Sequence, residues 1–512
     1  MSPLSRRRFL AAGAAGAAGL LATGCAPEPA PTPTATPVGP PDWSALAAGL
    51  GGSLARPGDA DYDSVRVTEN PRWDDARPLA VLTASDARDV AAGLAFATKY
   101  GLPIALRSGG HSYPGYSAGG AAGSGVKPSL VIDSRGMTAV TLAADNTVRI
   151  GAGASLAQVY DGIGSHGRAI AGGSCATVGI AGLTLGGGVG VLVRAYGLTC
   201  DSLTKVEIVT ADARVLTASA TTNADLFWAC RGGGGGHLGV VTALTFATKP
   251  APEVTMFSLS WAFSSAAAVI TAWQAWAPTA DPRLWSTLKL LNGPAYTTGP
   301  GVFVSGTWLG DPAALDSLLA PFIASAGAPR KRGVSQHSYR DAMASYAGCA
   351  TIPVAACQTG AGGRLTRESL SATSHVAYRA LDAAGIRAIT DHVSAAKGLA
   401  GLKEGGISID ALGGAVGDLA PDATAFPHRA ALATVQYTAT FANGGDPAPF
   451  DAYVRRFRAS LTGSWGDGAY VNYADATLTD PAKSYFAANA GRLAAIRAKH
   501  DPRGLFTQPQ AY

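Results

Sequence analysis

The segment Ile104-Ala105-Leu106-Arg107-Ser108-Gly109-Gly110-His111-Ser112 joins a short apolar strand to a turn that is nearly bare of side chains. Adjacent glycines let backbone N–H groups come close to an anion such as a pyrophosphate. His111 directly follows the two glycines, so we expect its side chain at the tip of the turn. The segment therefore predicts a strand that ends in a ligand-binding loop.

A strand and a helix precede this segment. Residues 80–82 form an apolar run, and Thr83 or Ser85 can cap the helix that follows. Gly101 ends the helical pattern where a left-handed cap is favoured. The apolar positions at helical spacing are Val90, Leu94 and Ala97.

Two further glycine-rich segments follow, at residues 172–190 and 225–242. Strand-like runs lie between the glycine segments, at residues 130–133, 148–150 and 206–209. Three glycine loops on short β-branched strands predict an α+β fold that holds a dinucleotide. A single Rossmann fingerprint is absent, because the glycines near 186–190 lack an acidic residue at the usual offset on a following strand.

Composition limits the other possibilities. The 512 residues are too many for one hydrophobic core, and 47% hydrophobic against 15% charged residues indicates a well-buried globular protein. The net charge is only +5, and no basic stripe with interleaved aromatic residues is present. Nucleic acid is therefore not an expected partner.

The N-terminus has the features of an export signal. Residues 5–10 carry adjacent arginines followed by Phe-Leu, and a short Ala/Gly/Leu run then leads to Cys25. This pattern resembles a twin-arginine signal that is read by the matching export machinery, with a lipobox at the end of residues 1–25. Cys25 is then either a lipid anchor or an incidental cysteine. Residues 26–42 are rich in Pro, Thr and Ala and predict an extended tether. With the signal, this predicts an exported protein that is either lipid-anchored at the cell envelope, on the outer side of the cytoplasmic membrane, or secreted.

The second half has another pattern. Between residues 251 and 463, strand-like segments such as 257–260 and 302–305 alternate with Ala-rich helices, including one at 380–395. This mixture predicts an antiparallel sheet with helices on one face. Cys349 and Cys357 could form a disulfide in an exported protein, although their spacing alone does not establish one.

The glycine segments, together with Gly119-Gly120, resemble the berberine-bridge-enzyme-like family of FAD-linked oxidases. That family has the FAD-binding fold of vanillyl-alcohol oxidase and p-cresol methylhydroxylase. The resemblance runs to the end of the chain. It implies a two-lobed FAD-binding domain at residues 43–250 and an antiparallel-sheet substrate domain at 251–463. A C-terminal segment, 464–512, would return to the FAD domain.

The resemblance also implies how the flavin is held. In the family a histidine of the Gly-Gly-His turn is bonded to the flavin 8α-methyl carbon, and in bicovalent members a cysteine is bonded to C6. His111 and Cys175 occupy these positions; the alternatives are a loop histidine satisfied by backbone and a small buried cysteine. A small residue at Val178 favours access of oxygen. No metal is expected. The full set of expected cofactor-binding residues is Arg107, Ser108, Gly109, Gly110, His111, Ser112, Gly173, Cys175, Thr177, Val178, Gly179, Gly182, Gly186, Gly187, Gly188, Gly190, Gly239, Val240, Val241 and Asn472.

The catalytic residues are expected in two segments. Residues 470–473 match the family segment that returns to the flavin, which makes Tyr473 the candidate base and Asn472 a positioning residue. The alternative is a pair of core tyrosines. A free tyrosine titrates near pH 10, so the pKa of Tyr473 must be lowered for efficient catalysis near neutrality. Gln436 lies on a strand that faces the flavin but cannot act as a base. The remaining polar candidates, Cys200, Cys230, His428 and Arg429, are expected to be structural, and His237 receives no role.

The resemblance thus implies an FAD-dependent oxidase that acts on an alcohol-type small molecule, with oxygen as acceptor and hydrogen peroxide as product. The substrate is expected to be an oligosaccharide; the alternative is an oxidase or dehydrogenase of the same family that acts on a glycoside, phenol or alkaloid of secondary metabolism. A cell-wall precursor reductase is the cytoplasmic alternative, and the export signal and His111 argue against it. A flavin-binding surface protein without activity is the remaining class.

Overall fold

The computed structural model describes residues 39–512. The predicted twin-arginine signal, Cys25 and most of the predicted tether lie outside the described residues. Within residues 39–512, no helix has the length and apolar character needed to cross a bilayer.

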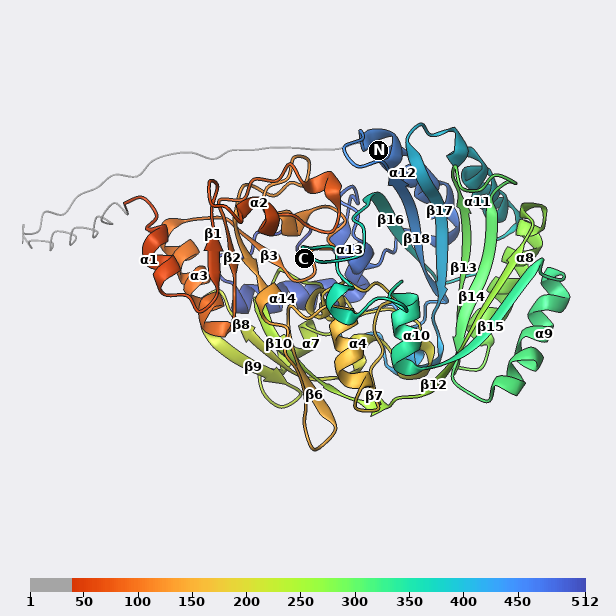
Figure 1. Cartoon of the computed structure of the whole chain (residues 1–512), viewed down its shortest axis with the longest axis horizontal. Helices are drawn as coiled ribbons and strands as arrows, with labels where there is room; N and C mark the ends of the chain where they lie inside the picture. The colour runs from red at the N-terminus through yellow and green to blue at the C-terminus, as the bar shows by residue number, and fades with distance from the viewer. Residues whose placement is uncertain (1–38) are drawn as a thin grey trace, which may run out of the picture. The chain divides into compact units, whose positions relative to one another are not determined.

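A small sheet carries the first glycine loop (Figure 1). Its strand order is β1-β2-β4-β3, and β2 and β3 both run parallel to β4. Asp86, rather than Thr83 or Ser85, caps helix α3, because its carboxylate accepts from the N–H groups of Arg88 and Asp89. Gly101 ends α3 in the predicted left-handed conformation, with φ 63°. The bounds are α1 Trp43–Ala48, β1 Ser53–Ala55, α2 Tyr62–Val65, β2 Ala80–Thr83, α3 Ala87–Tyr100, β3 Ile104–Arg107 and β4 Leu130–Asp133.

A second, antiparallel sheet completes the predicted FAD domain. Its strand order is β5-β6-β10-β8-β9. Strands β7 and β11 pair with each other in a separate two-stranded sheet. The core under this sheet includes the second glycine segment and residues of the C-terminal segment. The bounds are β5 Val140–Leu142, β6 Thr147–Gly151, α4 Leu156–Gly164, β7 Arg168–Ala169, α5 Ile180–Leu185, α6 Val193–Tyr196, β8 Leu203–Val209, β9 Val215–Ser219, α7 Ala224–Ala229, β10 Val240–Ala247 and β11 Lys249–Pro250.

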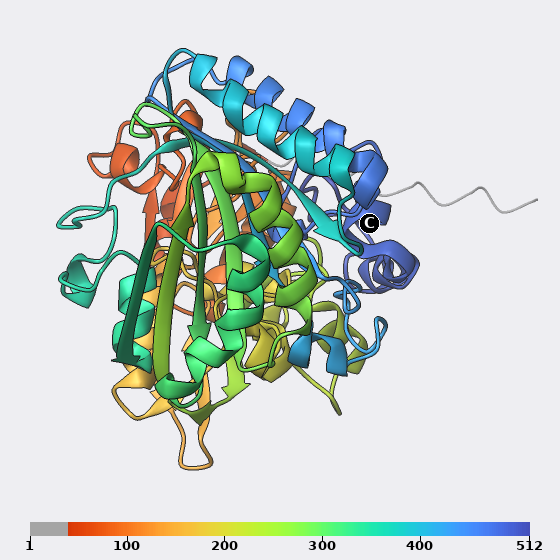
Figure 2. The ribbon, with the colours of Figure 1, turned by 90° about the vertical axis from the view of Figure 1, so that its right-hand side faces the viewer.

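A third sheet has seven antiparallel strands in the order β15-β12-β14-β13-β17-β18-β16. Helices α8, α9, α11 and α12 cover one face, as Figures 1 and 2 show, and bury its apolar side chains. Tyr437 of β18 lies in this core, whereas its neighbour Gln436 faces the other way, as strand alternation predicts. The bounds are β12 Glu253–Trp261, α8 Ala266–Trp276, β13 Leu284–Asn292, β14 Gly301–Trp308, α9 Leu315–Ala326, β15 Lys331–Ser338, α10 Tyr339–Tyr346, β16 Ser369–Ala377, α11 Ala383–Ala395, β17 Leu402–Ala411, β18 Ala433–Phe441 and α12 Ala448–Trp465.

The C-terminal segment returns to the FAD domain. Helices α13 (Pro481–Phe486) and α14 (Ala490–His500) follow a short 3₁₀ turn at Val471–Tyr473. Lys499 at the end of α14 forms an ion pair with Asp225 of α7, and Phe506 packs in the core of the first sheet. The predicted α+β architecture, with an antiparallel-sheet domain and a returning tail, is thus confirmed; the numbered domain boundaries stay predictions.

The cysteines are placed as expected. Cys349 and Cys357 form a disulfide, so the pairing that spacing could not establish is present. Cys200 and Cys230 are buried free thiols, which fits their expected structural role.

Candidate functional site

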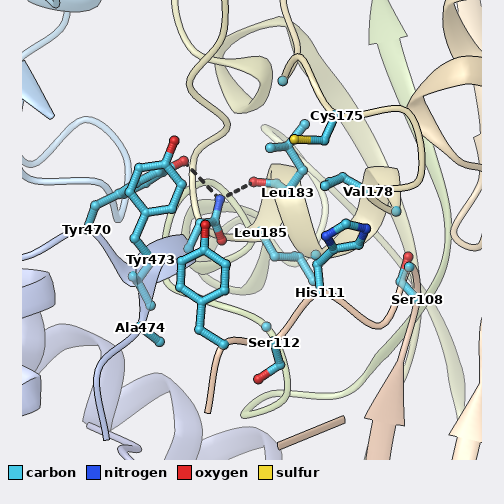
Figure 3. A pocket seen from close by; sticks show the side chains of 18 of the residues that line it. Ser108, His111, Ser112, Cys175, Val178, Leu183, Leu185, Tyr470, Tyr473 and Ala474 are labelled. Atoms are coloured by element: carbon cyan, nitrogen blue, oxygen red, sulfur yellow. Dashed lines mark hydrogen bonds between the residues drawn. The ribbon is translucent and has the colours of Figure 1, made fainter. Parts of the chain in front are cut away.

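A cavity of about 540 Å³ opens between the glycine loops, the uncovered face of the seven-stranded sheet and the C-terminal segment. Its size is in the range of sites that bind ligands and cofactors. Figure 3 shows His111 and Cys175 on one side of the pocket and Tyr470 and Tyr473 on the other. Loops from the first half of the chain thus face the tail across one cavity.

His111 stands at the end of β3 on the bare turn that the sequence predicted. Its Nε2 lies 2.8 Å from the hydroxyl oxygen of Thr177, and its Nδ1 has no protein partner among residues 39–512. Burial lowers the pKa of His111, which favours the neutral imidazole. A neutral ring with one nitrogen held and the other open is suited to nucleophilic attachment.

The glycines beside His111 permit a close approach of two loops. A Cβ on Gly109 would lie 2.2 Å from the backbone nitrogen of Gly179, a separation that no side chain tolerates. A Cβ on Gly179 would lie 2.3 Å from the nitrogen of Gly109 in return. These two glycines therefore bring the first and second glycine segments together at the cavity wall.

Cys175 is a free cysteine that is exposed toward the cavity. The cavity that Cys175 faces is recessed, so the surrounding protein desolvates its thiol and raises the thiol pKa, while Lys289 acts in the opposite direction. The neighbouring Ala176 packs against the Cys349–Cys357 disulfide, which closes a loop behind the cysteine. The reading of Cys175 as a small buried residue does not fit this exposure.

Some expected cofactor residues lie elsewhere than at the cavity surface. Gly186, Gly187 and Gly188 pack against side chains of the protein, and Thr177 stands behind His111. Arg107 is one of the residues that line the cavity. Its guanidinium, however, is fully buried and donates to backbone carbonyls, so it is not available to a ligand. The residues of the expected set that do line the cavity are Arg107, Ser108, Gly109, Gly110, His111, Ser112, Gly173, Cys175, Val178, Gly179, Gly182, Gly190, Gly239, Val240, Val241 and Asn472.

Asn472 and Tyr470 hold the tail against the second glycine segment. The Asn472 amide donates to the carbonyl of Leu183 and to the Tyr470 hydroxyl, both at 2.9 Å. The Tyr470 hydroxyl also accepts from the N–H groups of Gly188 and Val189, at 2.9 and 3.2 Å. Tyr470 is therefore a core residue, and the tyrosine that Asn472 orients by a hydrogen bond is Tyr470.

Tyr473 faces the cavity and is the tyrosine that a ligand can reach. Its ring lies nearly parallel to that of Tyr113, with centroids 5.9 Å apart and an interplanar angle of 14°. Burial raises the pKa of Tyr473, and the nearby Asp410 raises it further. The expected lowering of this pKa is therefore not produced by the chain's own residues, since acids rather than cations surround the phenol.

Sequence reasoning missed three polar residues of the cavity: Asp410 and Lys289 on its sheet face, and Tyr113 on the first glycine loop. Burial raises the pKa of the Asp410 carboxyl. Gln436 also lines the cavity, and its amide donates to the Tyr113 hydroxyl. Strand alternation was the available signal, because Ser408 and Asp410 share one face of β17.

The other polar candidates are structural. His428 donates from Nε2 to the carbonyl of Tyr485 and accepts at Nδ1 from Tyr378. Arg429 forms a bidentate ion pair with Asp201. No cluster of three or more His, Cys, Asp or Glu side chains that could hold a metal ion occurs in residues 39–512.

Two family models match this chain. An FAD binding domain covers residues 78–219, and a domain described as berberine and berberine like covers residues 469–511. The uncharacterized FAD-linked oxidoreductase YgaK of Bacillus subtilis is 30% identical over 468 residues, which are 90% of this chain and 97% of YgaK. The chain belongs to the berberine-bridge-enzyme-like family of FAD-linked oxidoreductases.

Other similar proteins are named as oligosaccharide oxidases, and the similarity covers most of this chain. The chitooligosaccharide oxidase of Gibberella zeae is 30% identical, and the match covers 85% of this chain and 87% of that protein. The solved glucooligosaccharide oxidase of Acremonium strictum superimposes with a TM-score of 0.80 at 28% identity, covering 92% of this chain and 98% of that one. The chain is therefore an FAD-linked oxidoreductase, and the cavity is the candidate site for FAD and substrate.

The residues present fit FAD. Glycine loops form one wall, where an added Cβ on Gly109, Gly179 or Gly190 would clash with the protein, and His111 and Cys175 open into the same cavity. His237, which also lines the cavity, has a buried Nδ1 without a hydrogen-bond partner among residues 39–512. These features are those expected of a site whose walls are completed by a bound cofactor.

Proposed function

We propose that this berberine-bridge-enzyme-like protein is an oligosaccharide oxidase with bicovalently attached FAD. The single observation that carries the proposal is that His111 and Cys175 open into one cavity opposite Tyr473. The Acremonium strictum glucooligosaccharide oxidase is described as having 6-S-cysteinyl, 8α-N1-histidyl FAD, which requires a histidine and a cysteine at one site. Relatives named as oxidases of chito-, gluco- and xylooligosaccharides support a carbohydrate alcohol as substrate.

The reaction removes two electrons and two protons from the anomeric C–OH group and gives a lactone. Bound FAD supplies the two-electron acceptor, from which oxygen is reduced to hydrogen peroxide. Tyr473 faces the reacting hydroxyl, and the Asp410 carboxylate is the acidic group of the same cavity wall. Because its raised pKa keeps the Tyr473 phenol protonated near neutrality, Asp410 is the group of this wall that can accept the hydroxyl proton, while Tyr473 orients the hydroxyl.

The attachment is tested by peptide mass mapping of purified wild type, His111→Ala and Cys175→Ala proteins. We expect flavin mass on both peptides of the wild type and on only the remaining peptide of each variant. His166→Ala, an exposed histidine, and Cys230→Ala, a buried cysteine, are the matched controls and keep both bonds. Folded wild type without any covalent flavin overturns the proposal.

The oxidase activity is tested separately by mixing the holoprotein with cellobiose without oxygen. We expect loss of the flavin absorbance, followed by its return and by peroxide formation when air is admitted. A flavin that stays oxidised with every oligosaccharide would favour the surface-protein class or a secondary-metabolite substrate.

We also propose that the protein is exported to the cell envelope and anchored through Cys25. The support is the Arg6-Arg7 pair and the small residues before Cys25. Replacing both arginines by lysine is expected to keep the protein in the cytoplasm, and Cys25→Ser to release it into the medium. Arg8→Lys is the control, and envelope localisation of the double variant would refute the twin-arginine route.

A further inference from the structure

Lys289 is a cation of the cavity wall that forms no ion pair within residues 39–512, although its charge acts to lower the pKa values of Asp410 and Cys175. Its side chain is exposed on β13 and lines the cavity. Within residues 39–512 it has neither a hydrogen bond nor an ion pair with a side chain or carbonyl. The other strong cation of the lining, Arg107, is fully engaged with the carbonyls of Val65, Arg66 and Ser117. The positive charge of Lys289 is therefore the one available to a ligand.

The register of the sheet fixes where this charge lies. Lys289 is opposite Ser408 of β17, and Ser408 is opposite Gln436 of β18, so the three side chains form one row on the cavity face. Thr287 and Asp410 are opposite each other in the next row. Residues two apart on a strand are separated by about 7 Å. Lys289 thus lies one row from the acid that faces Tyr473, a distance comparable to the width of a pyranose ring.

Aromatic side chains continue this surface outward. Phe303 of β14 is opposite Lys289, and the ring of Tyr296 lies 6.4 Å from that of Phe303, centroid to centroid. Both rings are half-buried, and both stand next to Gly301, where a Cβ would clash with them. The Tyr296 hydroxyl is held by Glu404 at 2.6 Å. An aromatic face can pack against the apolar C–H face of a sugar ring and so bury it. The hydroxyl groups at the edge of the sugar then stay free for hydrogen bonds.

We propose that Lys289 determines specificity by binding a substrate carboxylate, so that the substrates are oligosaccharides that contain a uronic acid. This inference rests on the proposed function. The row of Lys289, Ser408 and Gln436 supplies a cation, a hydroxyl and an amide for the carboxylate and the ring hydroxyls. The carboxylate is bound unchanged, and the oxidised bond remains the anomeric C–OH.

The test compares kcat/KM for digalacturonic acid and cellobiose in the holoenzyme. We expect the wild type to prefer the uronate at least tenfold, mainly through KM, because a charge-assisted contact is worth more than a neutral one. Lys289→Gln should reduce this preference ratio at least tenfold, and Lys289→Glu should reverse it. Lys331→Gln, on the exposed edge strand β15 of the same sheet, is the matched control and should keep the wild-type ratio. Salt should raise KM for the uronate more than for cellobiose.

Binding without turnover gives a second readout. Methyl β-glucuronide and methyl β-glucoside have a blocked anomeric hydroxyl, and their binding can be followed by the change in flavin absorbance. The glucuronide should bind more tightly to the wild type, and this advantage should disappear in Lys289→Gln. Covalent flavin content and melting temperature of each variant establish that it is folded.

The outcomes separate the two proposals. Oxidation of cellobiose with no preference for the uronate, or an unchanged ratio in Lys289→Gln, overturns the role of Lys289 and leaves the oxidase proposal intact. Flavin that no sugar reduces overturns the oxidase proposal and, with it, this one.

Discussion

At the scale of single residues, the two tyrosines of segment 470–473, Tyr470 and Tyr473, have different roles. The Tyr470 hydroxyl accepts hydrogen bonds from the N–H groups of Gly188 and Val189 and from the Asn472 amide. Tyr473, in contrast, faces the cavity. The intervening 3₁₀ turn, Val471–Tyr473, separates their directions. The motif therefore fastens the tail to the glycine loop with one ring and presents the other to the substrate.

The roles of Tyr473 and Asp410 can be separated by their pH profiles. Tyr473→Phe removes the hydroxyl that orients the substrate, so we expect kcat to fall by 10²- to 10⁴-fold, the usual contribution of acid–base groups. Asp410→Asn should lower kcat similarly and also remove the acidic limb of the kcat/KM profile, because the raised pKa of this carboxyl sets that limb. Loss of the acidic limb in Tyr473→Phe instead would contradict the assignment of the proton acceptor to Asp410.

At the scale of elements, a buried ion pair joins the two halves of the chain. Arg429, in the loop before β18, donates two hydrogen bonds of 2.8 and 2.7 Å to Asp201, beside α6. The side chains are only 2% and 10% exposed, so neither charge is well solvated without the other. The pair fixes the loop that leads into the strand of Gln436.

Removing one partner should therefore be costly. We expect Asp201→Asn to destabilise the protein by about 3–5 kcal/mol, since an uncompensated guanidinium stays buried. Asp212→Asn is the matched control, because the Asp212–Arg214 pair is exposed and such pairs contribute about 0–1 kcal/mol. Urea unfolding of the holoprotein measures the free energy of unfolding of each variant. Equal losses in the two variants would show that the buried ion pair stabilises the fold no more than the exposed one.

At the scale of the whole molecule, sequence reasoning was strongest where local pattern suffices. The strand–loop at residues 104–112, the cap at Gly101 and the outward face of Gln436 follow from glycine placement and alternation, and the structure has them. The cap at Asp86 is also local, because its carboxylate accepts from N–H groups two and three residues away, whereas Gly186 packs against Asn472, which it meets only in the fold. Lys289 and Asp410 reach one cavity through a strand register that no local window contains.

Burial of histidine across the fold predicts how stability depends on pH. His428 has both ring nitrogens bonded in the neutral form, and burial lowers its pKa to about 4. His237 is similarly lowered to about 4 by burial. Because the unfolded chain titrates near 6.5, it binds these protons first as the pH falls. The contribution of these two histidines to stability is thus complete above about pH 6.5 and is lost progressively toward pH 4.

The His428 contribution can be isolated by comparing unfolding at pH 7.5 and pH 5.0. From its pKa of about 4, linkage gives a loss of about 2 kcal/mol at pH 5 for this one group. His428→Gln should be less stable at pH 7.5, because the Tyr378 and Tyr485 contacts are disturbed, but should lose about 2 kcal/mol less than the wild type on acidification. His166→Gln, on an exposed histidine, should keep the wild-type pH dependence. An identical acid-induced loss in His428→Gln and wild type would mean that the carboxylates, rather than this buried imidazole, set the acid limit of the fold.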